Sequence, residues 1–162
     1  ANSVSNITVD AFEPHKGAFE RMEVNVKQNN FSNIIKCHNL ALSNENKEGY
    51  LLASSRFGEY QSGGAKLSIE GKMKIKQVCG DNVLKDVNNT IAIKVDVEGL
   101  ELLVLKGLAN FIKNNRIFLQ IEIFDQEFVK TSSFLEEHNF KLITKGTFTH
   151  QDNVKDYFYI NF

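Results

Sequence analysis

The hydrophobic pattern of the chain changes period between residues 91 and 112. Residues 91–95 are apolar and β-branched except for Lys94, which is typical of a buried strand in a parallel sheet. From Leu100 onward, apolar residues recur at the spacing of a helix face. Asp96 and Glu98 lie between the two patterns, where a strand would end and a helix begin. Open α/β sheets bind ligands at that edge, although these carboxylates could also serve only to cap the helix.

The rest of the chain predicts further strands and helices in alternation. The pattern indicates strands at 7–12, 34–42, 49–53, 73–78, 116–124, 140–145 and 157–162, and helices at 15–29, 81–87 and from Thr131 or Ser132 to about 139. On the first helix, Ala18, Phe19, Met22 and Val26 are expected to face inward. Residues 54–71, rich in glycine and serine, are interpreted as a mobile excursion with a short strand at 65–69.

This alternation predicts an α/β fold, namely a doubly wound and mostly parallel sheet. The strands that begin near residues 7, 34, 91 and 117 are expected to run parallel in one sheet. The strands at 140–145 and 157–162 are expected to form an antiparallel pair at its end. With 162 residues and 42% hydrophobic content, residues 1–162 are predicted to form a single domain.

Composition narrows the classes of partner. The net charge is −1 without a basic bias, which argues against a nucleic-acid partner. The sequence contains no apolar run long enough for a transmembrane segment, and its beginning does not resemble a signal peptide. The two cysteines lack metal-ligand spacing and are interpreted as buried free thiols, which indicates a reducing, cytoplasmic location.

The candidate chemistry lies in carboxylates that follow predicted strands. Glu13 comes directly after the first strand, where an acidic side chain can accept both hydroxyl protons of a ribose. A solvated loop carboxylate is the alternative role. Asp96 and Glu122 end two later strands. The four histidines are isolated and predict no metal site. The chain has neither a Gly-x-Ser-x-Gly elbow nor a Gly-x-Gly-x-x-Gly turn, which argues against a hydrolase triad and a dinucleotide-dependent dehydrogenase.

Three segments in order resemble the FkbM-type methyltransferases: Val9 to Pro14, Asn39 to Ser43, and the Lys-Val-Asp-Val-Glu-Gly-Leu-Glu run from Lys94 to Glu101 with its continuation to Gly107. The later Gln-Ile-Glu-Ile at 120–123 also fits. The resemblance implies a class I, Rossmann-like methyltransferase that uses S-adenosylmethionine. Such enzymes typically methylate hydroxyl groups of sugars or secondary metabolites, so the expected partner is a small-molecule or glycan acceptor.

The resemblance also implies roles for individual residues. Glu13 would bind the ribose of the cofactor, with Pro14 beside it, and Asn39, Leu40 and Ala41 would lie near the adenine. Asp96, together with Glu98, would line the pocket where cofactor and acceptor meet, and either carboxylate could act as the base. No metal is implied.

One part of the family pattern is not in this sequence. The family begins with a strand and a glycine-rich turn that cradles the methionine part of the cofactor. That strand would pair between the strands near residues 7 and 91, so without it both are expected to keep an unpaired edge, which is costly for buried backbone groups. We therefore expect a sequence truncated at its N-terminus; a genuinely shorter protein would need to close its sheet differently. A non-catalytic nucleotide- or sugar-binding module derived from the fold remains the alternative function.

Overall fold

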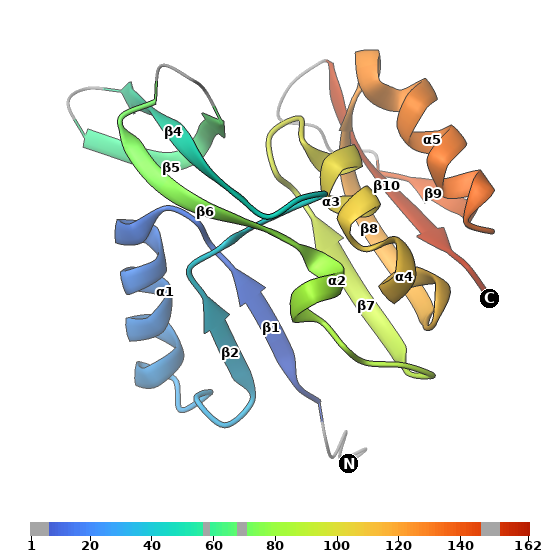
Figure 1. Ribbon diagram of the computed structural model, residues 1–162, viewed down its shortest axis with the longest axis horizontal. Helices are drawn as coiled ribbons and strands as arrows, with labels where there is room; N and C mark the ends of the chain where they lie inside the picture. Colours follow the sequence, from blue (N-terminus) through green and yellow to red (C-terminus); the bar gives the residue numbers. More distant parts are fainter. Residues whose placement is uncertain (1–6, 57–58, 68–70, 147–152) are drawn as a thin grey trace. The chain divides into compact units, whose positions relative to one another are not determined.

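A computed structural model describes residues 7–56, 59–67, 71–146 and 153–162. The chain divides into two compact units (Figure 1). The first comprises Ala1–Ala41 and Lys47–Gln77, and the second comprises Leu42–Asn46 and Val78–Phe162. Each unit is described separately below.

The first unit begins with a strand–helix–strand segment. Strand β1 (Val9–Phe12) pairs in parallel with β2 (Ile35–His38), in a register that places Phe12 opposite His38. Helix α1 (Lys16–Gln28) connects them, as the period predicted. The residues expected to face inward are half-buried, namely Ala18, Phe19, Met22 and Val26, but the helix has no fully buried residue.

The remainder of the first unit is a β hairpin with a third strand. Strand β4 (Lys47–Arg56) pairs antiparallel with β5 (Glu59–Leu67) and with β6 (Met73–Cys79). Residues 54–56 and 59–67 of the predicted excursion belong to β4 and β5, so the short strand predicted at 65–69 is part of a longer pairing; residues 57–58 and 68–70 lie outside the described part. The predicted strand at 49–53 is the middle of the longer β4.

The strand predicted at 34–42 is two strands. Strand β2 ends at His38, and β3 (Ala41–Ser43) begins after a break at Asn39 and Leu40. Strand β3 belongs to a sheet of order β3-β6-β4-β5, in which β6 starts in the first unit and ends in the second. Apolar residues lie on both sides of the break, so the pattern was interpreted as one strand.

The second unit contains a four-stranded sheet of order β7-β8-β10-β9. Strand β7 (Thr90–Val95) runs parallel to β8 (Arg116–Phe124), whereas β10 (Val154–Ile160) is antiparallel to both β8 and β9 (Lys141–Lys145). The antiparallel pair at the end of the chain was predicted correctly. The fold is α/β with parallel and antiparallel strands.

The four strands expected to share one parallel sheet lie in two sheets. Strands β1 and β2 form one parallel pair, and β7 and β8 form another. Among the described strands, β1 pairs only with β2 and β7 only with β8, so each has one edge without a described partner. The family resemblance led us to expect an unpaired edge on each of these two strands, because the family's first strand, which would pair with both, is not in this sequence.

Helices of the second unit are short. They are α2 (Gly80–Val83), α3 (Glu101–Gly107), α4 (Ala109–Lys113), the 3-10 helix η1 (Asp125–Glu127) and α5 (Phe128–Glu137). The helix predicted at 81–87 ends at Val83. Helix α5 begins before the predicted cap at Thr131 or Ser132, because η1 leads directly into it, and Thr131 is buried inside the helix.

The core of the second unit lies between its sheet and helices α3, α4 and α5, which cover one face of the sheet (Figure 1). Alternate residues of β8 point into this core and are fully buried, namely Ile117, Leu119, Ile121 and Ile123. Gly107 closes α3 where the backbone of Ser43 passes, and a Cβ there would lie 1.8 Å from the Ser43 carbonyl oxygen. Apolar burial and this close approach fix the position of α3 and α4 within the second unit.

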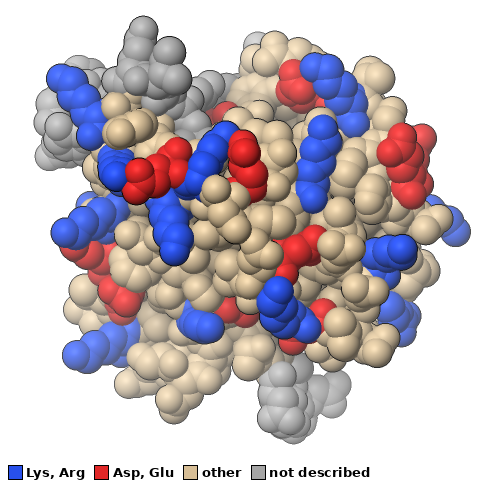
Figure 2. Space-filling model, viewed as in Figure 1, with Lys and Arg blue, Asp and Glu red and all other residues tan. Residues whose placement is uncertain are grey.

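Basic and acidic side chains are interspersed on the face of the molecule in Figure 2. In the described part of the chain, no helix combines the length and apolarity needed to cross a membrane.

Candidate functional site

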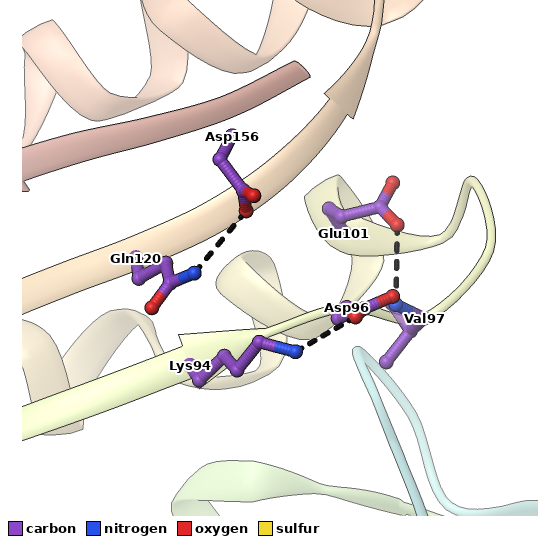
Figure 3. Close-up of polar contacts among 6 residues, drawn as sticks. All are labelled: Lys94, Asp96, Val97, Glu101, Gln120 and Asp156. Atoms are coloured by element: carbon purple, nitrogen blue, oxygen red, sulfur yellow. Dashed lines mark hydrogen bonds and ion pairs between the residues drawn. The ribbon is translucent and has the colours of Figure 1, made fainter. Parts of the chain in front are cut away.

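The loop between β7 and α3 is organised by Glu101. This side chain is 2% exposed, and its Oε1 accepts hydrogen bonds from the backbone nitrogens of Gly99 at 2.9 Å and Val97 at 3.3 Å (Figure 3 draws the second). Glu98 and Gly99 both have positive φ, at 57° and 96°, as this tight loop requires. Burial raises the pKa of Glu101, although the backbone donors oppose the shift.

Capping of the helix by Asp96 or Glu98 was considered from the sequence, and the structure places neither in that role. Leu100 is the N-cap of α3 and makes no side-chain cap bond. The carboxylate in the first turn is Glu101. The Glu101 carboxylate binds backbone nitrogens of the loop. Among the hydrogen bonds of the described residues, neither Asp96 nor Glu98 caps the helix.

Asp96 follows the last residue of β7 and forms an ion pair with Lys94. The distance between Lys94 Nζ and Asp96 Oδ2 is 2.8 Å, and both side chains are largely exposed (Figure 3). The hydrogen bond to Asp96 is the main cause that raises the pKa of Lys94. Lys94, the only charged residue in the apolar run, thus places a fixed positive charge beside this carboxylate.

Glu122 stands on β8 and faces Asp156, its register partner on β10. Gln120 on the same strand donates to Asp156 Oδ1 at 3.3 Å (Figure 3). Burial raises the pKa of Glu122 from 4.5 to about 7, with further contributions from the negative charges of Asp96, Glu98, Asp156 and Glu101. Glu122 can therefore exchange a proton near neutral pH.

Sequence reasoning noted Glu122 as a strand-ending carboxylate and Glu101 as the end of the Lys94 to Glu101 run but gave neither a role, and it missed Asp156. The alternation in β8 was a usable signal, because Gln120 and Glu122 fall on the face opposite the buried isoleucines. For Asp156, no local signal exists, because its position depends on the pairing of β10 with β8 across residues distant in sequence.

Glu13 lies in the turn that follows β1 in the first unit. It is half-buried, its backbone nitrogen donates to the His38 carbonyl at 3.0 Å, and its Oε1 accepts from the His15 nitrogen at 2.7 Å. His15 is the N-cap of α1, so Pro14 lies just outside the helix. His15 caps through its own Nδ1, which accepts from Ala18 N at 3.2 Å.

Asn39 is brought to the same turn from the end of β2. Its Nδ2 donates to the Glu13 carbonyl at 2.9 Å and to the Pro14 carbonyl at 3.2 Å. Leu40 and Ala41, which follow it, are half-buried. The structure therefore groups Glu13, Pro14 and Asn39 in the first unit, and it groups Asp96 and Glu98 with Glu122 in the second.

The Glu13 turn satisfies a chemical requirement of a ribose site. In the described part of the chain, one carboxylate oxygen of Glu13 accepts a backbone hydrogen bond, and no bond occupies the other, Oε2. A free carboxylate oxygen can accept from a pair of adjacent hydroxyls. Within that same part, no group of three or more histidine, cysteine, aspartate or glutamate side chains is arranged to hold a metal ion.

Comparisons with known proteins agree on one family. Residues 5–142 match the Methyltransferase FkbM domain. A stretch of 64 residues is 42% identical to the hexuronic acid methyltransferase AglP of Haloferax volcanii, covering 38% of this chain and 26% of that protein. The chain also resembles the crystal structure of methyltransferase FkbM from Methylobacillus flagellatus KT, with a TM-score of 0.60, 15% identity, and coverage of 94% of this chain and 36% of the other.

The chain thus spans about a quarter of the length of the curated relative and about a third of the structural neighbour. The family match, in contrast, extends over most of the chain and through both units. The protein belongs to the FkbM methyltransferase family.

Proposed function

We propose that this chain forms part of an S-adenosylmethionine-dependent methyltransferase that methylates a hydroxyl group of a sugar or secondary metabolite. The observation that carries the proposal is the carboxylate edge of β7 and β8, where Glu122 has a pKa of about 7, in a member of the FkbM methyltransferase family. Because the family match runs through both units, we assign them to one methyltransferase domain.

The cofactor-binding role falls to the Glu13 turn. Oε2 of Glu13 would accept hydrogen bonds from the ribose hydroxyls, while Oε1 remains bound to the His15 nitrogen. Pro14, Leu40 and Ala41 would add apolar contact next to it. When bound, S-adenosylmethionine supplies an electrophilic methyl group on a positively charged sulfur.

The acceptor-binding role falls to the carboxylates at the carboxyl end of β7 and β8. A hydroxyl acceptor must lose its proton as its oxygen forms the new bond, and a base is most effective when its pKa is near the working pH. Asp96 and Glu98 were the bases considered from the sequence. We add Glu122 as a third candidate, because its raised pKa would let it take the proton at a carboxylate oxygen while Asp96 and Glu98 orient the acceptor. Most of the rate enhancement would come from that orientation.

The charge of this edge bears on the acceptor. Asp96, Glu98 and Asp156 each raise the pKa of Glu122, which means that their negative charges act on the same small region. A carboxylate on the acceptor would be repelled there unless a cation accompanied it. The edge therefore favours a neutral hydroxyl over an ionised acid group as the methyl acceptor. The printed name of AglP, a hexuronic acid methyltransferase, supports a sugar acceptor. A hexuronic acid would have to present a hydroxyl to this edge with its own carboxylate directed away.

Calorimetric titration of the chain with S-adenosylmethionine tests the cofactor assignment. Glu13→Gln should weaken binding by about 1.5–3 kcal/mol, because a neutral oxygen replaces an ionised acceptor of hydrogen bonds. Glu23→Gln, on the exposed face of α1, is the matched control and should bind as the unaltered chain does. Equal affinity of the Glu13→Gln and unaltered chains would remove Glu13 from the site.

Transfer of a labelled methyl group to neutral sugars and to hexuronic acids tests the chemistry. Replacement of the base should lower the rate by roughly 10²-fold or more. We therefore compare Glu122→Gln, Asp96→Asn and Glu98→Gln, and expect the largest loss for Glu122→Gln with the fold retained. Cofactor binding without transfer to any acceptor would instead favour a non-catalytic binding module.

A further inference from the structure

The turn after β1 is fixed at three backbone positions in a row. The nitrogen of Glu13 donates to the carbonyl of His38, and one side-chain amide, Nδ2 of Asn39, donates to the carbonyls of both Glu13 and Pro14. Pro14 has no N–H of its own. The Asn39 amide is therefore the group that determines how the two peptide planes of this turn are oriented.

The peptide between Pro14 and His15 connects Asn39 to the Glu13 carboxylate. Its oxygen accepts from Asn39 Nδ2 at 3.2 Å, and its nitrogen donates to Glu13 Oε1 at 2.7 Å. Because a peptide unit is planar and rigid, holding its oxygen also directs its N–H. The bond from His15 N to a carboxylate is charge-assisted and sets the direction of the Glu13 side chain.

The base of the turn is anchored independently of Asn39. The rings of Phe12 and His38, which are register partners, stack with centroids 4.5 Å apart, and His38 Nε2 lies 2.7 Å from Asp10 Oδ1. These contacts hold the ends of β1 and β2 together. Asn39 is the next residue after His38, so its position is defined by the strand pair and does not depend on the Glu13 carboxylate.

We propose that Asn39 is a positioning residue that fixes the Glu13 carboxylate for cofactor binding, acting through the Pro14–His15 peptide and not through contact with the adenine. This proposal rests on the proposed function, in which Glu13 binds the ribose. Asparagine meets the requirement because its amide carries two N–H donors, one for each carbonyl. Aspartate has the same shape but, when ionised, has no donor and would repel both carbonyls.

The first experiment measures amide hydrogen exchange by NMR on the chain without ligand. Asn39→Ala and Asn39→Asp should speed exchange of the His15 amide by about threefold or more, because its acceptor is no longer held. Asn29→Ala is the matched control, since Asn29 Nδ2 also donates to a backbone carbonyl of this unit, that of Asn25 at 2.8 Å. It should leave the His15 amide unchanged. Unchanged exchange in both Asn39 variants would overturn the proposal.

The second experiment is a double-mutant cycle read by calorimetric titration with S-adenosylhomocysteine. Asn39→Ala should weaken binding by about threefold to tenfold, the range of a neutral hydrogen bond. In a Glu13→Ala background the same change should weaken binding by less than about twofold, because the residue that Asn39 positions is gone. An equal loss in both backgrounds would mean that Asn39 contacts the ligand itself and would overturn the proposal.

The two experiments separate failure of the positioning role from failure of the proposed function. If the unaltered chain does not bind the cofactor product but the His15 amide exchanges faster in Asn39→Ala, Glu13 is still positioned by Asn39 and its assignment to the ribose is wrong. If the chain binds and the cycle shows no coupling, the cofactor assignment stands and the positioning role is wrong.

Discussion

Two strand–helix–strand segments of this chain have the same plan but are held in different ways. In β1–α1–β2 and in β7–α3–α4–β8, two parallel strands flank helical structure, and a carboxylate follows the first strand, Glu13 in one case and Asp96 in the other. Helix α1 has no buried residue, whereas α3 and α4 contribute Val104, Leu105, Phe111 and Ile112 to the core of their unit.

The difference determines what each carboxylate can do. Glu13 is fixed by hydrogen bonds within its turn, so substitutions there should alter binding more than stability. The carboxylates near Asp96 rest on a packed sheet, and partial burial with mutual repulsion shifts the pKa of Glu122. Packing in the second segment thus supports a proton-accepting group, while the first supports a fixed acceptor of hydrogen bonds.

The largest expected effect is the loss of stability caused by Gly107→Ala. The new Cβ would lie 1.8 Å from the Ser43 carbonyl oxygen and 2.7 Å from its carbon, so α3 or the Ser43 backbone would have to move. We expect a loss of at least about 3 kcal/mol in the free energy of unfolding, measured by urea titration.

Gly17→Ala in the other segment is the contrasting variant. A Cβ at Gly17 meets its nearest neighbour, the His15 ring, at 3.4 Å, which is ordinary contact. Because alanine favours helix, we expect a gain of about 0.5 kcal/mol. A comparable loss in both variants would show that the two segments are packed equally tightly.

A smaller effect is expected in the pH dependence of stability. The pKa of Glu122 rises from 4.5 in the unfolded chain to about 7 in the folded protein, so between these values the folded state binds more protons. Stability from this group is present below about pH 4.5 and is lost as the pH rises through 7. The shift corresponds to at most about 3 kcal/mol, which solvent screening reduces to about 1–2.

Glu122→Gln should therefore stabilise the protein at pH 8 relative to the unaltered chain, and much less at pH 4.5. Urea titrations at both pH values provide the measurement. Glu23→Gln removes an exposed carboxylate of α1 and serves as the control for a simple change in net charge. If the two variants respond identically, the carboxylate edge does not act on Glu122 as described.

The sequence predicted that β1 is parallel to β2 and β7 to β8, and it predicted the bounds of β8. These features depend on which residues are buried, and burial leaves a pattern of apolar residues over a few neighbouring positions. The sequence could not predict that β1 and β7 lie in different sheets, since strand order depends on distant pairing. The break at Asn39 was not recognised because apolar residues lie on both sides of it. Its amide bonds to Glu13 and Pro14 show why the break is there.

The sequence predicted where the carboxylates of the candidate site lie along the chain, but not which groups they contact. Glu13, Asp96 and Glu98 follow strands, which a pattern can show. The partner of each is set by geometry: the His15 nitrogen for Glu13 and the Lys94 ammonium for Asp96. Glu101 was part of the Lys94 to Glu101 run but received no role from the pattern, and it is buried with its carboxylate bound to the backbone of the loop.

The smallest expected loss of stability concerns a cap that one helix of the second unit provides for another. Leu108, the N-cap of α4, makes no side-chain cap bond. Asp81 in α2 replaces it: its Oδ2 accepts from the nitrogen of Asn110 at 3.0 Å and its Oδ1 from that of Phe111 at 2.8 Å. Asp81→Asn would turn an amide N–H toward one of these donors and remove the charge that favours a helix N-terminus.

We expect Asp81→Asn to lower the free energy of unfolding by about 1 kcal/mol, as loss of a cap does, without a change in cofactor affinity. Asp86→Asn is the matched control, because the exposed Asp86 carboxylate accepts only from the Asn89 side chain, at 3.3 Å, among the hydrogen bonds of the described residues. Urea titration of both variants should show a loss for Asp81→Asn alone. Equal stability of the two variants would mean that apolar packing holds α4 in place without the cap. The second unit would then be stabilised almost entirely by packing, in still sharper contrast to the hydrogen-bonded Glu13 turn.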